Sequence, residues 1–347
     1  MGGLLPKTNE DSEEYYAYPN SLLYDFNFLY FHPQRNIKDK IRIKNNGLIK
    51  INTHKVINLN TNCKNIFYLK DGRLSSTFRK KVFIFQENIK IKVISAHKEY
   101  IFYHTQLSNG NIITCSKDKT MKIISIYDYS IIQTFEHKDE VYRVVERNNN
   151  QIISSTKNGY IHFWEKKHNN EKYKYIQKFK VFEESSHINL LLINKNELVI
   201  TNEGESLIQF WNLNTNQTVL VLKNANKIYF DKISKILYTN DVKKDSSNEY
   251  KETGKFNIID TKKKILIGHI STGEKGSYIT HCLGNNIIFR NINGETVLFN
   301  VNYEKGNEEI TYRTINCSCE GYYHEFFFHN NKLKTIHINY VDEYKAP

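Results

Sequence analysis

The feature that most constrains this sequence is a six-residue phrase that occurs twice and ends each time in tryptophan. The two copies, GYIHFW (159–164) and SLIQFW (206–211), contain both tryptophans of the 347-residue chain. Four other phrases share the pattern, which is rich in β-branched and aromatic residues and ends in a large apolar side chain. They end at Phe85, Ile124, Ile259 and Phe299. The six ends lie 39 to 48 residues apart along the chain, and such a period indicates a repeat architecture.

Three more β-like runs accompany each phrase. In the second repeat, NIITCS (111–116) precedes the phrase, SIIQTF (130–135) follows it, and EVYRVV (140–145) comes after a short polar loop. Four antiparallel strands in about 40–48 residues form a β-propeller blade. One such sheet cannot bury both of its faces, so blades stack radially and the closed ring removes most exposed edges. The residue that ends each phrase is therefore predicted to lie on the third strand and to pack between adjacent blades.

In register with these repeats are residues that resemble the landmarks of the WD40 family. The landmarks are a histidine after the outer strand, an acidic or amide residue in the second turn, and a tryptophan ending the third strand. The matching residues are His97, His137 and His269, then Asp118 and Asn158, then Trp164 and Trp211. The Trp-Asp pair itself is never intact, since Glu165 and Asn212 follow the two tryptophans. The resemblance covers roughly residues 46–340 and implies that His, Ser or Thr, Asp and Trp form a hydrogen-bonded chain that stiffens a blade.

Repeat count and resemblance together predict an all-β, WD40-like β-propeller over residues 46–347. Joining GLIKINT (47–53) and KVINLN (55–60) to the C-terminal runs from 322–339 would make a seventh blade, closed by N- and C-terminal strands. Eight blades stay open as an alternative, because β-like runs in 21–45 could begin another sheet. Otherwise, residues 21–45 are an N-terminal extension or part of the closing blade. We expect the acidic tail, residues 1–20, to be disordered.

Composition limits where the protein works and what it binds. Five scattered cysteines fit a reducing compartment, and the longest apolar runs, such as LLLI (190–193), are too short to span a bilayer. These features predict a cytoplasmic or nuclear protein without a transmembrane segment. The net charge of +12 invites a nucleic-acid partner, but eight arginines stand against 41 lysines. Specific phosphate and base recognition favours arginine, so we expect protein partners and keep RNA or a ribonucleoprotein as the alternative.

No frame of catalytic residues stands out in the sequence. Cys317, Cys319, His324 and His329 cluster, yet the two histidines are five apart on a predicted strand and point to opposite faces. Hence we expect no metal, no cofactor and no enzyme, although a propeller enzyme with converging carboxylates stays open as a weaker alternative. The segment 240–254 reads as a long hydrophilic loop, of the kind that is often functional.

The resulting functional expectation is a scaffold that binds other proteins as a subunit of a larger complex. Loops on one face of the ring would present aromatic and charged side chains around the channel, because such residues concentrate binding energy. The predicted partner-binding residues enter the innermost strand of each blade. They are Tyr100, Glu140, His187, Lys227, Tyr278 and Tyr322.

Overall fold

The computed structural model shows an all-β protein. It describes residues 30–33, 42–51, 64–86, 89–168, 171–183, 187–225, 227–247, 250–271, 278–283, 286–290, 296–302, 309–317, 323–329 and 332–338. Every regular element in these ranges is a β-strand. No helix in the described part of the chain is long and apolar enough to cross a membrane. The expected tail, residues 1–20, lies outside the described residues, as do most of 21–45 and the run 55–60.

Six sheets share one plan, in which four consecutive strands pair antiparallel in chain order. Blade 1 contains β3 (Lys64–Tyr68), β4 (Leu74–Phe78), β5 (Lys81–Gln86) and β6 (Ile89–Ser95). Blade 2 contains β7 (Ile101–Gln106), β8 (Ile112–Ser116), β9 (Thr120–Ile124) and β10 (Ile131–Glu136). Blade 3 contains β11 (Val141–Asn148), β12 (Gln151–Thr156), β13 (Tyr160–Glu165) and β14 (Lys174–Lys180).

The other three blades follow the same order. Blade 4 contains β15 (Ile188–Asn194), β16 (Glu197–Asn202), β17 (Leu207–Asn212) and β18 (Gln217–Lys223). Blade 5 contains β19 (Ile228–Asp231), β20 (Ile236–Lys244), β21 (Tyr250–Asp260) and β22 (Ile265–Ser271). Blade 6 contains β23 (Tyr278–Leu283), β24 (Asn286–Arg290), β25 (Thr296–Asn302) and β26 (Glu309–Cys317). A seventh, two-stranded sheet pairs β27 (Tyr323–His329) with β28 (Lys332–Ile338).

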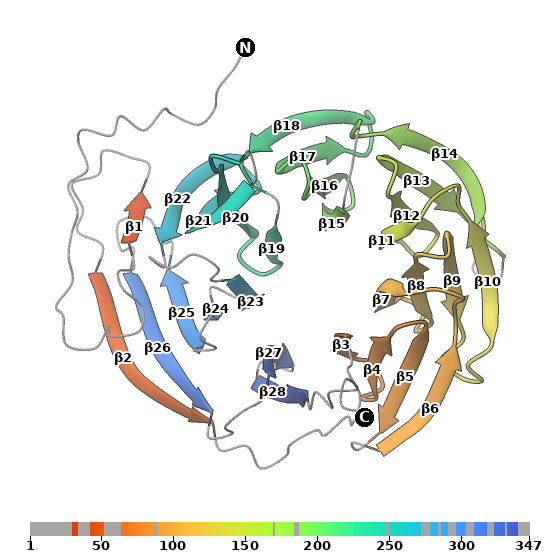
Figure 1. Ribbon diagram of the computed structural model, residues 1–347, viewed down its shortest axis with the longest axis horizontal. Coiled ribbons are helices and arrows are strands. Elements are labelled where there is room, and N and C mark those ends of the chain that lie inside the picture. Colours follow the sequence, from red (N-terminus) through yellow and green to blue (C-terminus); the bar gives the residue numbers. More distant parts are fainter. Residues whose placement is uncertain are drawn as a thin grey trace.

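The sheets stand around a common centre, which makes the fold a β-propeller (Figure 1). The first strand of each blade lies nearest the centre and the fourth lies at the rim. All six repeat ends, from Phe85 on β5 to Phe299 on β25, lie on the third strand of their blades, as the sequence predicts. The repeat thus locates the strands, because period-two alternation and turn residues are local signals.

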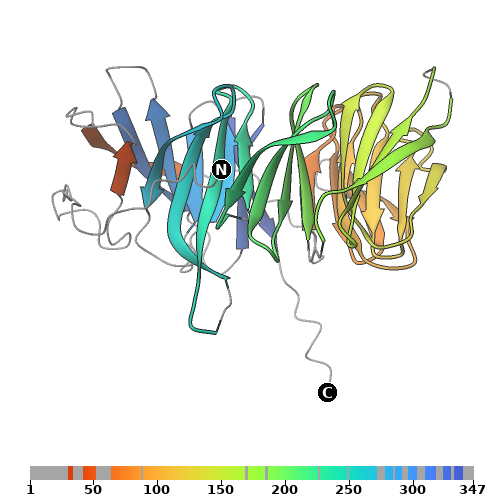
Figure 2. The same cartoon turned by 90° about the horizontal axis from the view of Figure 1, so that it is seen from above.

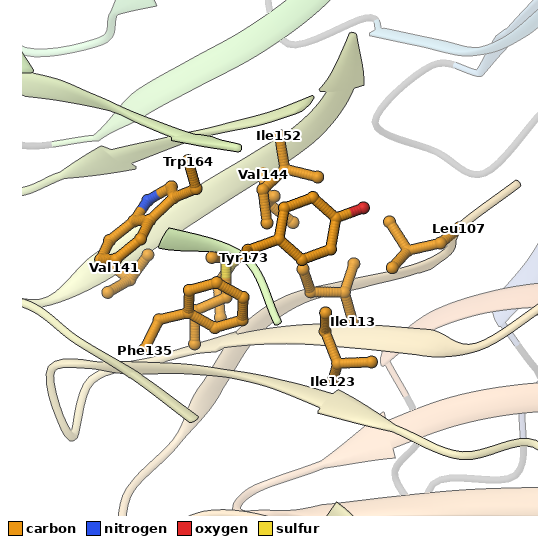
Figure 3. Packing of buried hydrophobic residues seen from close by; sticks show 11 residues of the cluster. Leu107, Ile113, Ile123, Phe135, Val141, Val144, Ile152, Trp164 and Tyr173 are labelled. Carbon is orange, nitrogen blue, oxygen red and sulfur yellow. The ribbon is translucent and has the colours of Figure 1, made fainter. Parts of the chain in front are cut away.

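The core of the protein consists of apolar layers between neighbouring blades. Figure 3 shows the layer between blades 2 and 3, where Phe135 of β10 and Trp164 of β13 meet edge to face at 5.0 Å. Trp211 occupies the equivalent place between blades 3 and 4, next to Phe179 at 5.8 Å. Each layer takes side chains from both blades, so no sheet is stable alone and the stacking supplies most of the burial.

The strands near the two chain ends pair differently from our expectation. The run 47–53 was predicted to join the C-terminal strands, but β2 (Arg42–Ile51) pairs in parallel with β26, and Ile49 lies opposite Ile315. A shorter strand, β1 (Tyr30–Pro33), pairs antiparallel with β22. The physical reason is that the rim strand of a blade exposes unpaired N–H and C=O groups, and β1 and β2 cover two such edges. Among the described residues β27 and β28 pair only with each other.

The segment 240–254 is also not the loop that its composition indicates. Strands β20 and β21 continue through most of it as a paired hairpin, with Val242 opposite Glu252 and Lys244 opposite Tyr250. In Figure 2 this hairpin extends beyond the other blades on one side of the ring. Its base is held by the Thr253 hydroxyl, which donates a 2.8 Å hydrogen bond to the half-buried Asp241 carboxylate. The strands of this hairpin are hydrophilic, so they lack the alternation of apolar and polar residues that identifies a strand in a sequence.

Candidate functional site

The five predicted partner-binding residues that the structure describes lie on one face of the ring. We call it the mouth face: the face on which β7, β11, β15, β19 and β23 begin. Three of these residues take equivalent backbone positions. The carbonyls of Tyr100, Glu140 and His187 each accept a hydrogen bond from the turn between the second and third strands of the same blade. The donors are the amides of Lys117 at 2.9 Å, Lys157 at 2.9 Å and Glu203 at 3.2 Å.

The remaining predicted residues are placed less completely. The amide of Lys227, just before β19, donates to Asn240 Oδ1 at 2.8 Å, at the base of the extended hairpin of blade 5. Tyr278 is the first residue of β23, and Tyr322 lies outside the described residues. Tyr100 is 53% exposed and His187 is exposed, so both side chains are available at the mouth face.

A row of rings that the sequence analysis missed connects three blades at this face. Phe102 of β7 meets Tyr142 of β11 at a centroid separation of 5.0 Å, and Tyr142 stacks on His187 at 4.8 Å with ring planes 10° apart. Phe102 and Tyr142 sit at bulges, where the strand pairing skips one residue. A bulge redirects its side chain and is common beside functional sites. The sequence feature that could have predicted this row is the aromatic residue two positions after each of Tyr100 and Glu140.

The electrostatic environment of this row is mixed. The Glu140 carboxylate lies 3.4 Å from Lys157 Nζ. Burial, followed by the nearby charges of Glu140 and Asp139, raises the pKa of Tyr142 to about 12, so its phenol stays neutral. The row therefore combines neutral rings with a carboxylate and a lysine at its margin.

The family's hydrogen-bonded chain is present in part in blade 2. His97 Nδ1 lies 3.0 Å from the Asp118 carboxylate, and His97 Nε2 lies 2.7 Å from the Thr114 hydroxyl. The Asp118 carboxylate also accepts bonds from the Thr120 hydroxyl at 2.6 Å and the Lys98 amide at 2.9 Å. Burial alone would raise the pKa of Asp118, but these bonds and His97 lower it overall. The chain stops at Thr114, because Ile124 holds the tryptophan position.

Blade 3 has the complementary part of the chain. Trp164 Nε1 donates to the Ser154 hydroxyl at 3.0 Å, and that hydroxyl lies 3.0 Å from His137 Nε2. Asn158, in the Asp118 position, accepts from the Thr156 hydroxyl instead, and His137 Nδ1 has no partner among the described residues. Burial lowers the pKa of His137 to about 4 and keeps the ring neutral.

The other landmarks lie outside such a chain. Trp211 Nε1 is buried without a hydrogen-bond partner in the described part of the structure. The turn after β16 is one residue longer than its counterpart in blade 3, so Leu198 faces Trp211 while Ile200 takes the place of Ser154. Gly268 and His269, expected after the outer strand, lie within β22 and pair with β21. The WD40-like chain therefore survives as two halves in two adjacent blades.

Other polar groups of the interior brace the sheets. His104 Nε2 lies 2.9 Å from the Ser75 hydroxyl of the preceding blade, and burial lowers its pKa to about 3. No group of three or more histidine, cysteine or carboxylate side chains converges within the described residues. Of the clustered C-terminal residues, Cys317 ends β26 and the two histidines lie on β27, while Cys319 falls outside the described residues.

Comparisons with known proteins agree with this fold. One similar structure is a chain of the mitotic checkpoint complex, with a TM-score of 0.59 and 10% identity over 79% of this chain and 89% of that one. Another is U3-55K, with a TM-score of 0.57 and 12% identity over 73% of this chain and 81% of that one. No family model and no curated protein sequence matches the chain. At such low identity the likeness defines the fold alone. The fold that the strands and these comparisons define is a β-propeller.

Proposed function

We propose that this protein is a non-catalytic scaffold that binds other proteins through its mouth face within a multiprotein assembly. The observation that carries the proposal is the row Phe102–Tyr142–His187, which joins the innermost strands of three blades beside the exposed Tyr100. A similar propeller from a solved mitotic checkpoint complex supports an assembly role by analogy.

The physical basis is a preformed surface. Phe102 is half-buried on a paired strand, and Tyr142, only 7% exposed, packs between Phe102 and the exposed His187. A partner therefore meets a surface that is already held in place, with little loss of conformational entropy. Interface energy concentrates in a few aromatic and arginine residues near the centre of the contact. The mouth face offers such a centre, while Glu140, Lys157 and Glu203 at its margin can set the orientation of the partner.

The RNA-binding alternative makes a different prediction about this face. Phosphates would be repelled by the carboxylates of Asp139 and Glu140 but attracted by exposed lysines of the loops at the same face, such as Lys98 and Lys138. Retention or loss of partners after nuclease treatment therefore distinguishes the protein-binding proposal from the RNA-binding alternative.

The test is affinity purification of the tagged full chain from its own cells, with and without nuclease, followed by mass spectrometry. The double variant Tyr100→Ala and His187→Ala should lose partners that the wild type retains after nuclease. The control is Tyr127→Ala, because Tyr127 is 88% exposed in the turn after β9, on the opposite face of the ring. Loss of all partners on nuclease treatment, or equal retention by the double variant, would overturn the proposal.

A further inference from the structure

The rim of the propeller offers backbone edges, and among the described residues the chain itself covers two of them. In blades 5 and 6 the outer strands β22 and β26 are paired with β1 and β2. The corresponding strands of blades 1 to 4 pair only with their inner neighbours among the described residues. These strands are β6, β10, β14 and β18. An open edge carries unpaired N–H and C=O groups and is a template for an added strand.

A bulge repeated at the rim defines how much of each edge is usable. In β6, β10, β14 and β18 the pairing with the third strand skips one residue. The skipped residues are Ile91, Ile132, Ile176 and Val219. In β22 the skipped residue is Ile267, and β1 pairs only with Gly268–Ser271 directly after it. A bulge terminates regular pairing, so each blade presents the four residues that follow its bulge.

The edge of β14 has the chemistry of a specific docking site. Its four residues after the bulge are Gln177–Lys180, the positions that β1 occupies on β22. Lys174, Lys178 and Lys180 are exposed, and the strand contains no carboxylate. Tyr175 and Ile176 are 48% and 51% exposed and add apolar area beside the edge. The equivalent residues of β10, Gln133–Glu136, contain no lysine and end in a carboxylate.

We propose that the outer edge of β14 binds an extended acidic segment of a partner protein by strand addition. The mode is the one that β1 displays on β22, and the acidic chemistry follows from the three lysines. The inference rests on the proposed scaffold function and assigns to it a second surface, at the rim and separate from the mouth face. Because only four residues can pair, the contact is short and depends on charge, so the affinity falls as salt rises.

The neighbouring contacts of the lysines leave them able to serve this role. Lys180 Nζ lies 2.6 Å from the Glu183 carboxylate, and Lys178 Nζ lies 4.2 Å from the centre of the Tyr160 ring. Both contacts are at the surface, where an ion pair contributes little to folding stability. An incoming carboxylate can therefore take up either lysine without unfolding the blade.

The test is binding of a fluorescent heptapeptide of alternating glutamate and valine to the full chain, followed by anisotropy. The first control probe has alternate amides N-methylated, which removes backbone donors and keeps every side chain. The second is the same peptide with lysine in place of glutamate. We expect at least tenfold weaker binding for either control, and tenfold weaker binding of the original peptide to K178E/K180E. The matched variant K262E/K263E makes the same charge change in the exposed turn after β21 and should bind as wild type.

Several outcomes would overturn the assignment. These are no binding of the acidic peptide, equal binding of the N-methylated peptide, or equal loss in both charge variants. Self-association of the wild type that K178E/K180E abolishes in sedimentation would identify a second copy as the occupant instead. Comparable binding of an oligouridine, lost in the same variant, would identify nucleic acid. The Tyr100→Ala and His187→Ala variant should keep peptide binding, so failure of the mouth-face proposal and failure of this one are distinguishable.

Discussion

The two tryptophans of this protein provide a matched pair for testing what one buried hydrogen bond contributes to a blade. Both are almost fully buried, at 8% exposure for Trp164 and 7% for Trp211, and both end the third strand of their blades. Only Trp164 has an acceptor, the Ser154 hydroxyl at 3.0 Å, whereas Trp211 Nε1 has none among the described residues. Replacing each by phenylalanine removes similar apolar area and keeps an aromatic ring, so the indole N–H is the main difference.

The expected difference in stability between the two Trp→Phe variants follows from the free-energy cost of burying a polar group without a partner. Trp164→Phe loses a hydrogen bond with a net value of about 0.5–1.5 kcal/mol. Trp211→Phe instead removes an unsatisfied donor, whose burial costs about 1–3 kcal/mol in the wild type. The shared loss of packing cancels between the two variants. Trp164→Phe should therefore lower the free energy of unfolding by about 2–4 kcal/mol more than Trp211→Phe does.

The measurement is urea unfolding followed by far-ultraviolet circular dichroism, because each variant removes one of the two tryptophans that fluorescence would report. Ser154→Ala combined with Trp164→Phe completes a double-mutant cycle, and we expect a coupling of about 1 kcal/mol. Equal destabilisation by the two Trp→Phe variants, or a larger effect of Trp211→Phe, would refute the assignment of the donors.

Three further predictions concern other contacts of the blades. Asn158→Asp should give His137 Nδ1 the carboxylate that it lacks, raise the pKa of His137 above its present value of about 4, and stabilise the protein by about 1 kcal/mol. Titration by NMR would measure the pKa, and urea unfolding would measure the stability. Gly110→Ala should lower the free energy of unfolding by only about 1–2 kcal/mol, because of the positive φ, whereas Gly159→Ala should lower it clearly more, because an added Cβ would lie 2.0 Å from a backbone oxygen. A comparison of the Tm values of the two variants tests this. Burial lowers the pKa of His104 to about 3, so the folded state favours the neutral ring, and the stability that this ring contributes is lost as pH falls from about 6.5 towards 3. In His104→Gln the slope of the free energy of unfolding against pH should be smaller by about 1.4 kcal/mol per pH unit in this window, and an unchanged slope would contradict the reasoning.

The blades of the propeller could be predicted from the sequence because the patterns that indicate strands and turns are local. Each repeat places its third strand at a run such as YIHFW (160–164), and the turn residues between runs fix the antiparallel order. Stacking of apolar faces between blades then follows from the inability of one sheet to bury both sides. The residues predicted for the mouth face take equivalent backbone positions in blades 2 to 4, since their distance from the same repeat is similar; that they bind a partner stays a prediction.

Tertiary structure decided the features that depend on pairing between distant segments. The sequence of β2 fits any open edge, and only the folded ring shows that it pairs with β26 and not with the C-terminal strands. The hydrophilic hairpin at 240–254 is held by its own backbone pairing, which leaves no apolar pattern to detect. The row Phe102–Tyr142–His187 exists because bulges in two different blades turn their rings towards one another. Strand periodicity is encoded along the chain, whereas the choice of neighbour is made by edges and faces that meet only after folding.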